Sequence, residues 1–91
     1  MLKEKKNFEQ EVISIKLTSG EEIVGVCVDQ DSESITVSQP YIYADNLQLS
    51  PWLKTSSETQ IRLNKKTVIA IVRTETNISV LYTESTTTEN A

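Results

Sequence analysis

Residues 17–26 read LTSGEEIVGV and contain both glycines of this 91-residue chain. The preceding residues, 12–18, alternate between apolar and polar side chains, which is typical of a half-buried strand. Gly20 then supplies the positive φ that a short hairpin turn requires. Gly25 falls inside the next strand, where a glycine usually marks a sharp bend or a close backbone approach. The stretch therefore predicts a hairpin with a bent second strand, which is how a short sheet curls into a small barrel.

The rest of the chain continues the β pattern. A third strand begins at Ile35, and Pro40 either interrupts it or places it at a sheet edge. A fourth strand covers residues 61–63. Residues 68–72, VIAIV, form a continuous apolar run that reads as a strand covered on both faces. In so small a domain, cover on both faces implies barrel closure or a contact between subunits. We therefore predict a mainly β fold, a five-stranded, strongly bent antiparallel small barrel.

The ends of the chain are expected to lie outside this barrel, which spans residues 12–73. Residues 1–11 are polar and rich in helix formers, and we expect an N-terminal arm or a short helix. Residues 74–84 form a C-terminal extension whose apolar residues fit a helix or a strand. Residues 85–91 are predicted to be a disordered tail because they are threonine-rich and nearly devoid of apolar side chains.

Composition narrows the class of protein. The single cysteine, Cys27, allows no internal disulfide and favours a reducing compartment. The sequence has no apolar run long enough to span a bilayer. We expect a soluble, cytoplasmic protein with no membrane partner. The net charge of −4 argues against indiscriminate nucleic-acid binding but leaves room for a local basic site. Such a site would draw on the basic residues of the segment 62–73.

Residues that support catalysis are scarce. The chain has no histidine, which removes the commonest general base and a frequent metal ligand. Cys27 lies among valines with no base to activate it. The acidic segment of Asp29, Asp31 and Glu33 lacks the glycine and distal glutamate of a calcium-binding loop, and we interpret it as a solvated turn. We therefore expect no enzymatic activity, no metal and no cofactor.

The order of these features resembles the Sm-like family, which comprises the Sm, LSm and Hfq proteins. The first half-motif of that family is an apolar alternation leading to glycine, a second glycine, an aspartate turn and a further apolar alternation. It is matched here by Ile13, Ile15, Leu17, Gly20, Ile23, Gly25, Asp31, Ile35 and Val37. The asparagine that follows the aspartate in the family is missing, and Ser34 or Ile35 stands near its place.

The second half-motif is Ile-Arg-Gly followed by an apolar strand. Ile61 and Arg62 match its start, residues 68–72 supply the strand, and Leu63 replaces the glycine. The glycine spacing and the Pro51-Trp52 insertion are also similar to the Sm-like proteins carried by cyanobacterial phages. For a phage-encoded protein, the host-cell cytoplasm would be the expected location.

The resemblance implies a homo-oligomeric ring of roughly five to seven copies that binds single-stranded RNA or DNA and acts in RNA processing or regulation. The ring pairs the fourth strand of one copy with the fifth strand of the next. The implied nucleic-acid-binding residues lie on two turns and the strand between them, and are Asp31, Ser34, Arg62, Asn64, Lys65 and Lys66. The expectation is above all an RNA site, in which basic residues hold phosphate.

Other interpretations of these residues remain open. The two lysines equally suit a solvated turn, and Arg62 equally suits an outward ion pair with a carboxylate. Tyr41, Tyr43 and Trp52 suit base stacking, but packing is the commoner role of aromatics in a small barrel. One alternative function is an adaptor ring that binds a protein partner and no nucleic acid. Another is a monomeric SH3-like barrel that recognises a peptide in an aromatic groove.

Overall fold

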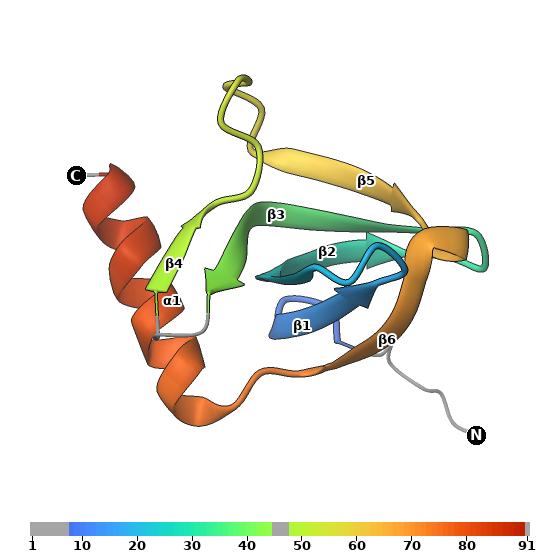
Figure 1. Cartoon of the computed structure of the whole chain (residues 1–91), viewed down its shortest axis with the longest axis horizontal. Coiled ribbons are helices and arrows are strands. Elements are labelled where there is room, and N and C mark those ends of the chain that lie inside the picture. Colours follow the sequence, from blue (N-terminus) through green and yellow to red (C-terminus); the bar gives the residue numbers. More distant parts are fainter. Residues whose placement is uncertain (1–7, 45–47, 91) are drawn as a thin grey trace.

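The computed structural model describes residues 8–44 and 48–90. These residues form an antiparallel sheet, a short 3-10 turn and a C-terminal helix (Figure 1). The strands pair in the order β4-β3-β2-β1-β6, and β5 pairs with β3. The elements are β1 (Val12–Leu17), β2 (Glu22–Gln30), β3 (Ser34–Ala44), β4 (Gln48–Pro51), β5 (Gln60–Asn64), η1 (Lys65–Thr67), β6 (Val68–Arg73) and α1 (Thr76–Asn90).

The first hairpin is confirmed. β1 and β2 pair with Ile15 opposite Ile23, and both side chains are fully buried. Gly20 lies in the turn with φ +100°, and its N–H donates to the carbonyl of Leu17 at 2.9 Å. The sequence placed glycine where the backbone enters the left-handed region, which other residues rarely adopt.

Gly25 lies where β2 meets a kink in β3. The pairing of the two strands shifts between Val24 and Val26, and Gln39 on β3 has φ +49°. A Cβ atom at Gly25 would collide with Cγ1 of Val37 and would lie 3.1 Å from the carbonyl oxygen of Ser38. The glycine is therefore required because the bent strands approach each other too closely for any side chain.

The kink divides β3 into two halves with different partners. Residues 34–38 pair with β5, whereas residues 41–44 pair with β4. Pro40 follows the kink and is buried inside a continuous strand. The expectation that Pro40 interrupts the strand or marks an edge is therefore wrong. β2 and β3 have no ladder pair at the proline, which has no N–H to donate, and its carbonyl accepts the Trp52 N–H at 3.0 Å.

The fold is mainly β, as predicted, but it differs from the predicted five-stranded small barrel in two respects. The sheet has six strands, because residues 48–51 add β4. Nor does the sheet close within one chain. Across the described residues, β5 pairs only with β3 and β6 pairs only with β1, so each leaves one edge without a partner. The short η1 turn joins these two strands without bringing them side by side.

The buried apolar side chains form two clusters. The larger one, the main core, contains residues of β1, β2, β3 and β5: Ile13, Ile15, Leu17, Ile23, Cys27, Ile35, Val37 and Leu63. The second cluster consists of Val24, Tyr41 and Tyr82, with Ile78 and Leu49 among the partly buried residues packed against it. Tyr82 and Ile78 belong to α1. The helix therefore covers the face of the sheet on which Val24 and Tyr41 lie.

The described chain carries a turn before β1 and a helix after β6. Residues 8–10 form a turn, and Phe8 and Gln10 both have positive φ. The remainder of the predicted N-terminal arm, residues 1–7, lies outside the described residues. The extension left undecided between helix and strand is helical. α1 also continues through residues 85–90, where we predicted a disordered tail.

Candidate nucleic-acid interface

The structure brings together the six residues predicted to bind nucleic acid. Ser34 lies directly opposite Asn64 in the pairing of β3 with β5. The turn between β2 and β3 touches η1, because the Lys65 N–H donates to the carbonyl of Glu33 at 2.9 Å. Glu33 and Asn64 line two neighbouring shallow hollows, the first together with Asp31, Ser34 and Arg62, and the second together with Ser32, Lys65 and Lys66. The β2–β3 turn and η1 lie at the end of the sheet away from α1 (Figure 1).

Asp31 organises the turn that enters β3. Its Oδ1 atom accepts the backbone N–H groups of Glu33 and Ser34, each at 2.8 Å, and the hydroxyl of Ser34 at 3.2 Å. An aspartate in this position mimics one arm of a backbone turn. The two N–H bonds, together with the weaker influence of Arg62, hold the pKa of the Asp31 carboxyl below its ordinary value of 3.8. Asp31 therefore stays negatively charged at neutral pH.

Arg62 is engaged by the same turn. Its Nε atom donates to the hydroxyl of Ser34 at 3.2 Å, and its guanidinium lies 3.9 Å from Oδ2 of Asp31. The side chains of Arg62 and Asp31 are 74% and 55% exposed, so water screens this ion pair strongly. The alternative in which Arg62 points outward and pairs with a carboxylate matches the structure. Arg62 is thus partly neutralised, although it remains accessible.

The two lysines lie on the η1 turn, which Asn64 caps. Oδ1 of Asn64 accepts the N–H of Lys66 at 2.8 Å, and the backbone carbonyl of Asn64 accepts the Thr67 hydroxyl at 2.7 Å. Lys65 is half-buried and Lys66 is exposed. This arrangement can attract phosphate through two ammonium groups, whereas the nearby carboxylates of Asp31 and Glu33 oppose it.

The aromatic candidates lie elsewhere. Tyr41 packs edge-to-face against Tyr82, with ring centroids 5.7 Å apart and an interplanar angle of 84°. Trp52 packs against the main core, and Tyr43 lines a separate hollow with Val72 and Ile78. Tyr41 and Trp52 therefore have packing roles, and none of the three lines either hollow of the candidate interface.

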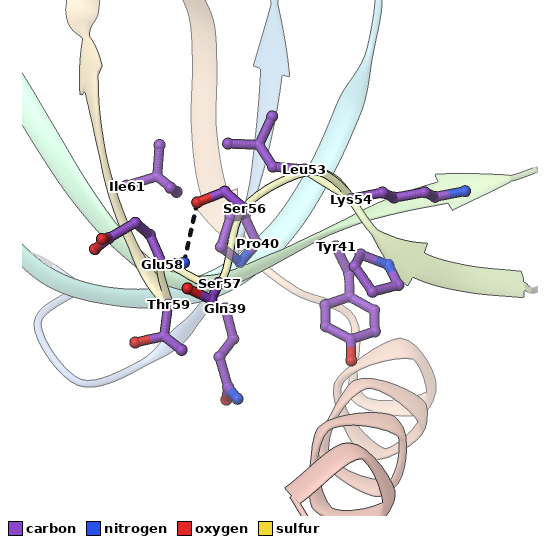
Figure 2. A pocket seen from close by; sticks show the side chains of 11 residues that line it. Gln39, Pro40, Tyr41, Leu53, Lys54, Ser56, Ser57, Glu58, Thr59 and Ile61 are labelled. Carbon is purple, nitrogen blue, oxygen red and sulfur yellow. Dashed lines mark hydrogen bonds between the residues drawn. The ribbon is translucent and has the colours of Figure 1, made fainter.

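A groove that sequence reasoning missed lies beneath the 52–59 loop (Figure 2). It has a volume of about 390 Å³, and its walls come from the kink of β3, from β5 and from the loop itself. Leu53 is 41% exposed at this groove. Ser56 stabilises the loop by accepting the Glu58 N–H at 3.0 Å. Residues 55–59, TSSET, are recognisable as a loop from their composition, and Pro51 precedes them, but neither signal predicts a groove.

Catalytic and metal-binding features are limited. Cys27 is fully buried, and burial, with a smaller contribution from Glu9 and Asp29, raises the pKa of its thiol. That is the reverse of an activated nucleophile. Within residues 8–44 and 48–90, no group of three His, Cys, Asp or Glu side chains is arranged to hold a metal ion. In the same part of the chain, no helix is long and apolar enough to cross a membrane.

Comparison with models of known protein families found no match, and neither did comparison with curated proteins. The class that the fold defines is therefore a small, mainly β domain with an open, strongly bent sheet and a C-terminal helix.

Proposed function

We propose that this protein forms an Sm-like homo-oligomeric ring that binds single-stranded nucleic acid, RNA in the first place, for RNA processing or regulation. The supporting observation is the gathering of Asp31, Ser34, Arg62, Asn64, Lys65 and Lys66 on two touching turns.

The sheet edges support assembly. β5 and β6 each have one neighbouring strand among the described residues, and an unpaired edge is a template for pairing with another chain. On β6, Ile69 is 64% exposed and Val72 is 54% exposed. Pairing β6 of one copy with β5 of the next would satisfy both edges. Because the two edges are different surfaces, repetition of this contact closes a ring when the rotation permits it.

Assembly would also explain how a chain with a net charge of −4 binds nucleic acid. The ring would repeat Lys65 and Lys66 in every copy, so an acidic protein would still present a concentrated basic surface. Phosphate groups held by such lysines release counterions, and binding then weakens steeply with salt. With no aromatic platform beside the lysines, backbone contacts would dominate and sequence preference would be modest.

The first experiment is native mass spectrometry of the full chain with short oligo-U and oligo-A RNA. We expect a closed oligomer that binds RNA at a defined stoichiometry.

Replacing both Lys65 and Lys66 by alanine should weaken RNA binding and flatten the slope of log affinity against log salt concentration. The matched control is the double alanine variant of Lys16 and Lys54, two exposed lysines outside the two hollows. Equal affinities and slopes for the two double variants would refute the site, and a monomer would refute the ring.

A second candidate function is an adaptor ring that binds protein partners without nucleic acid. The observation in its favour is the carboxylate of Asp31, which is ionised and offsets Arg62. With Glu33 on the same turn, two carboxylates offset most of the charge of the three basic side chains, Arg62, Lys65 and Lys66. An oligomer that ignores both RNAs at low salt would favour this function.

A further inference from the structure

The feature that neither the ring nor the RNA site uses is the contact between α1 and the kink of β3. We propose that Tyr82 and Gln39 couple the docking of α1 to the shape of the groove beneath the 52–59 loop. This inference goes beyond the proposed function and does not depend on it. It describes a conformational device in which the helix and the loop hold the same strand residue from two sides.

Tyr82 provides the contact from the helix. Its side chain is 2% exposed, and its hydroxyl donates to the carbonyl oxygens of Ser38 and Gln39, at 3.1 Å and 2.9 Å. A single hydroxyl proton serves these two acceptors in turn, which fixes the ring above the kink. Tyr41, the residue that follows Pro40, packs edge-to-face against the same ring. In Figure 2 the Tyr41 side chain extends from the groove toward the α1 ribbon.

Gln39 provides the contact to the loop. Its N–H donates to the carbonyl of Thr59 at 2.5 Å, while its own carbonyl accepts the Tyr82 hydroxyl. Gln39 also has φ +49°, a region that costs a residue with a side chain free energy and persists only where its surroundings hold it. Thr59 and Gln39 both line the groove. The strained residue is therefore bonded to the loop through its N–H and to the helix through its carbonyl.

α1 is suited to reversible docking. More than half of its residues are threonine, serine or asparagine, which favour helices weakly. A fifteen-residue helix of this composition is marginal in water without tertiary contacts. Thr86 is 8% exposed, and its hydroxyl bonds to the carbonyls of Tyr82 and Thr83 within the helix. Ile78 and Tyr82 attach the helix to the sheet, because both pack in the second cluster.

Two states follow from these contacts. In the docked state, Tyr82 holds the carbonyl of Gln39, the kink keeps its left-handed residue, and Thr59 stays against the strand. In the released state, the kink loses its hold from the helix, the Gln39–Thr59 bond weakens and the groove changes shape. Coupling between two sites is reciprocal, so a molecule that wedges the groove apart would also loosen α1.

Hydrogen exchange of the full-length Tyr82→Phe variant tests this coupling residue by residue. The substitution keeps the ring and removes only the hydroxyl. One lost buried hydrogen bond corresponds to roughly a tenfold shift in the opening equilibrium. We expect hydrogen exchange to become about tenfold faster at the α1 amides and also at the Gln39 amide. Tyr43→Phe is the matched control, because it removes a hydroxyl from β3 beyond the kink, and it should accelerate neither group.

A reciprocal variant, Thr59→Gly, loosens the loop without touching the helix and should accelerate exchange in α1. Thr59→Gly also tests the coupling if the Tyr82→Phe variant does not fold. Faster exchange in α1 of Tyr82→Phe with an unchanged Gln39 amide would overturn the proposal, because the helix would then dock independently of the kink. Unchanged exchange rates of the α1 amides in Thr59→Gly would also overturn the proposal.

Discussion

Gly25→Ala tests the claim that the bend of the sheet depends on close backbone approach. The added methyl would overlap Cγ1 of Val37 and press on the carbonyl of Ser38 at 3.1 Å. The side chain of Val37 is fully buried and has little room to move. The Ser38 carbonyl can yield only if the kink itself shifts.

The magnitude follows from two opposing effects. Overpacking a well-filled core costs about 1–3 kcal/mol. Alanine recovers roughly 0.5–1 kcal/mol of the entropy that glycine loses in a strand. Because one of the clashing groups is backbone, we expect the upper part of the range, a net loss of about 2 kcal/mol in the free energy of unfolding. For a domain of this size, that corresponds to a fall in Tm of roughly 8–16 °C.

The assay is urea unfolding at neutral pH, followed by circular dichroism, with a double-mutant cycle. Val37→Ala removes the methyl group that meets the new Cβ. The combined variant should therefore lose less stability than the sum of the two single losses, by at least about 0.5 kcal/mol. A Gly25→Ala protein as stable as the parent would refute the reasoning. So would strict additivity, because the clash with Val37 would then contribute nothing.

Two further predictions concern pH. The pKa of Asp31 is lowered in the folded state, so its stabilising contribution is fully present above the ordinary value of 3.8 and is lost as the pH falls through the folded-state pKa. NMR titration of its carboxyl resonance should place the midpoint below 3.8, and a midpoint at or above it would contradict the capping geometry. Burial, and secondarily Tyr41, raises the pKa of Tyr82 from 10.0 to about 12. The corresponding stability is complete below pH 10 and declines as the pH rises toward 12, so the unfolding midpoint in urea should drop across that interval in the parent and stay flatter in Tyr82→Phe.

The sequence predicted the parts of the fold that depend on local patterns. Alternation in residues 12–18 and the turn at Gly20 predicted the first hairpin, and the structure adds its register. Gly25 identified the bend, because a glycine inside a strand has few other uses. The six candidate residues were also found together, since the turns on which they lie come from strands that pair directly.

The parts that the sequence missed depend on contacts between distant segments. Pro40 looked like an interruption because no local rule says that β3 changes partners beside it. Ile78, Leu81 and Tyr82 fit a helix while Ile78, Val80 and Tyr82 fit a strand, and only packing on the sheet decides for the helix. Likewise, the threonine-rich segment after Glu84 has little helix preference of its own, and its helical form continues from the docked turns before it.

The pairing of β1 with β6 has a consequence for biosynthesis. β1 begins at Val12, whereas β6 ends at Arg73, so one of the two strands flanking β1 is made well after β1, β2 and β3. While the chain is still emerging from the ribosome, β1, β2 and β3 can already pair through short turns. The second edge of β1 stays open until residues 68–73 have left the exit tunnel, because Ile15 meets Ile71 only then. Each nascent chain thus passes through a stage in which the backbone edge of β1 at Ser14 and Ile15 has no partner strand. Crowding of neighbouring nascent chains on one message would bring such edges together before each had paired with its own β6.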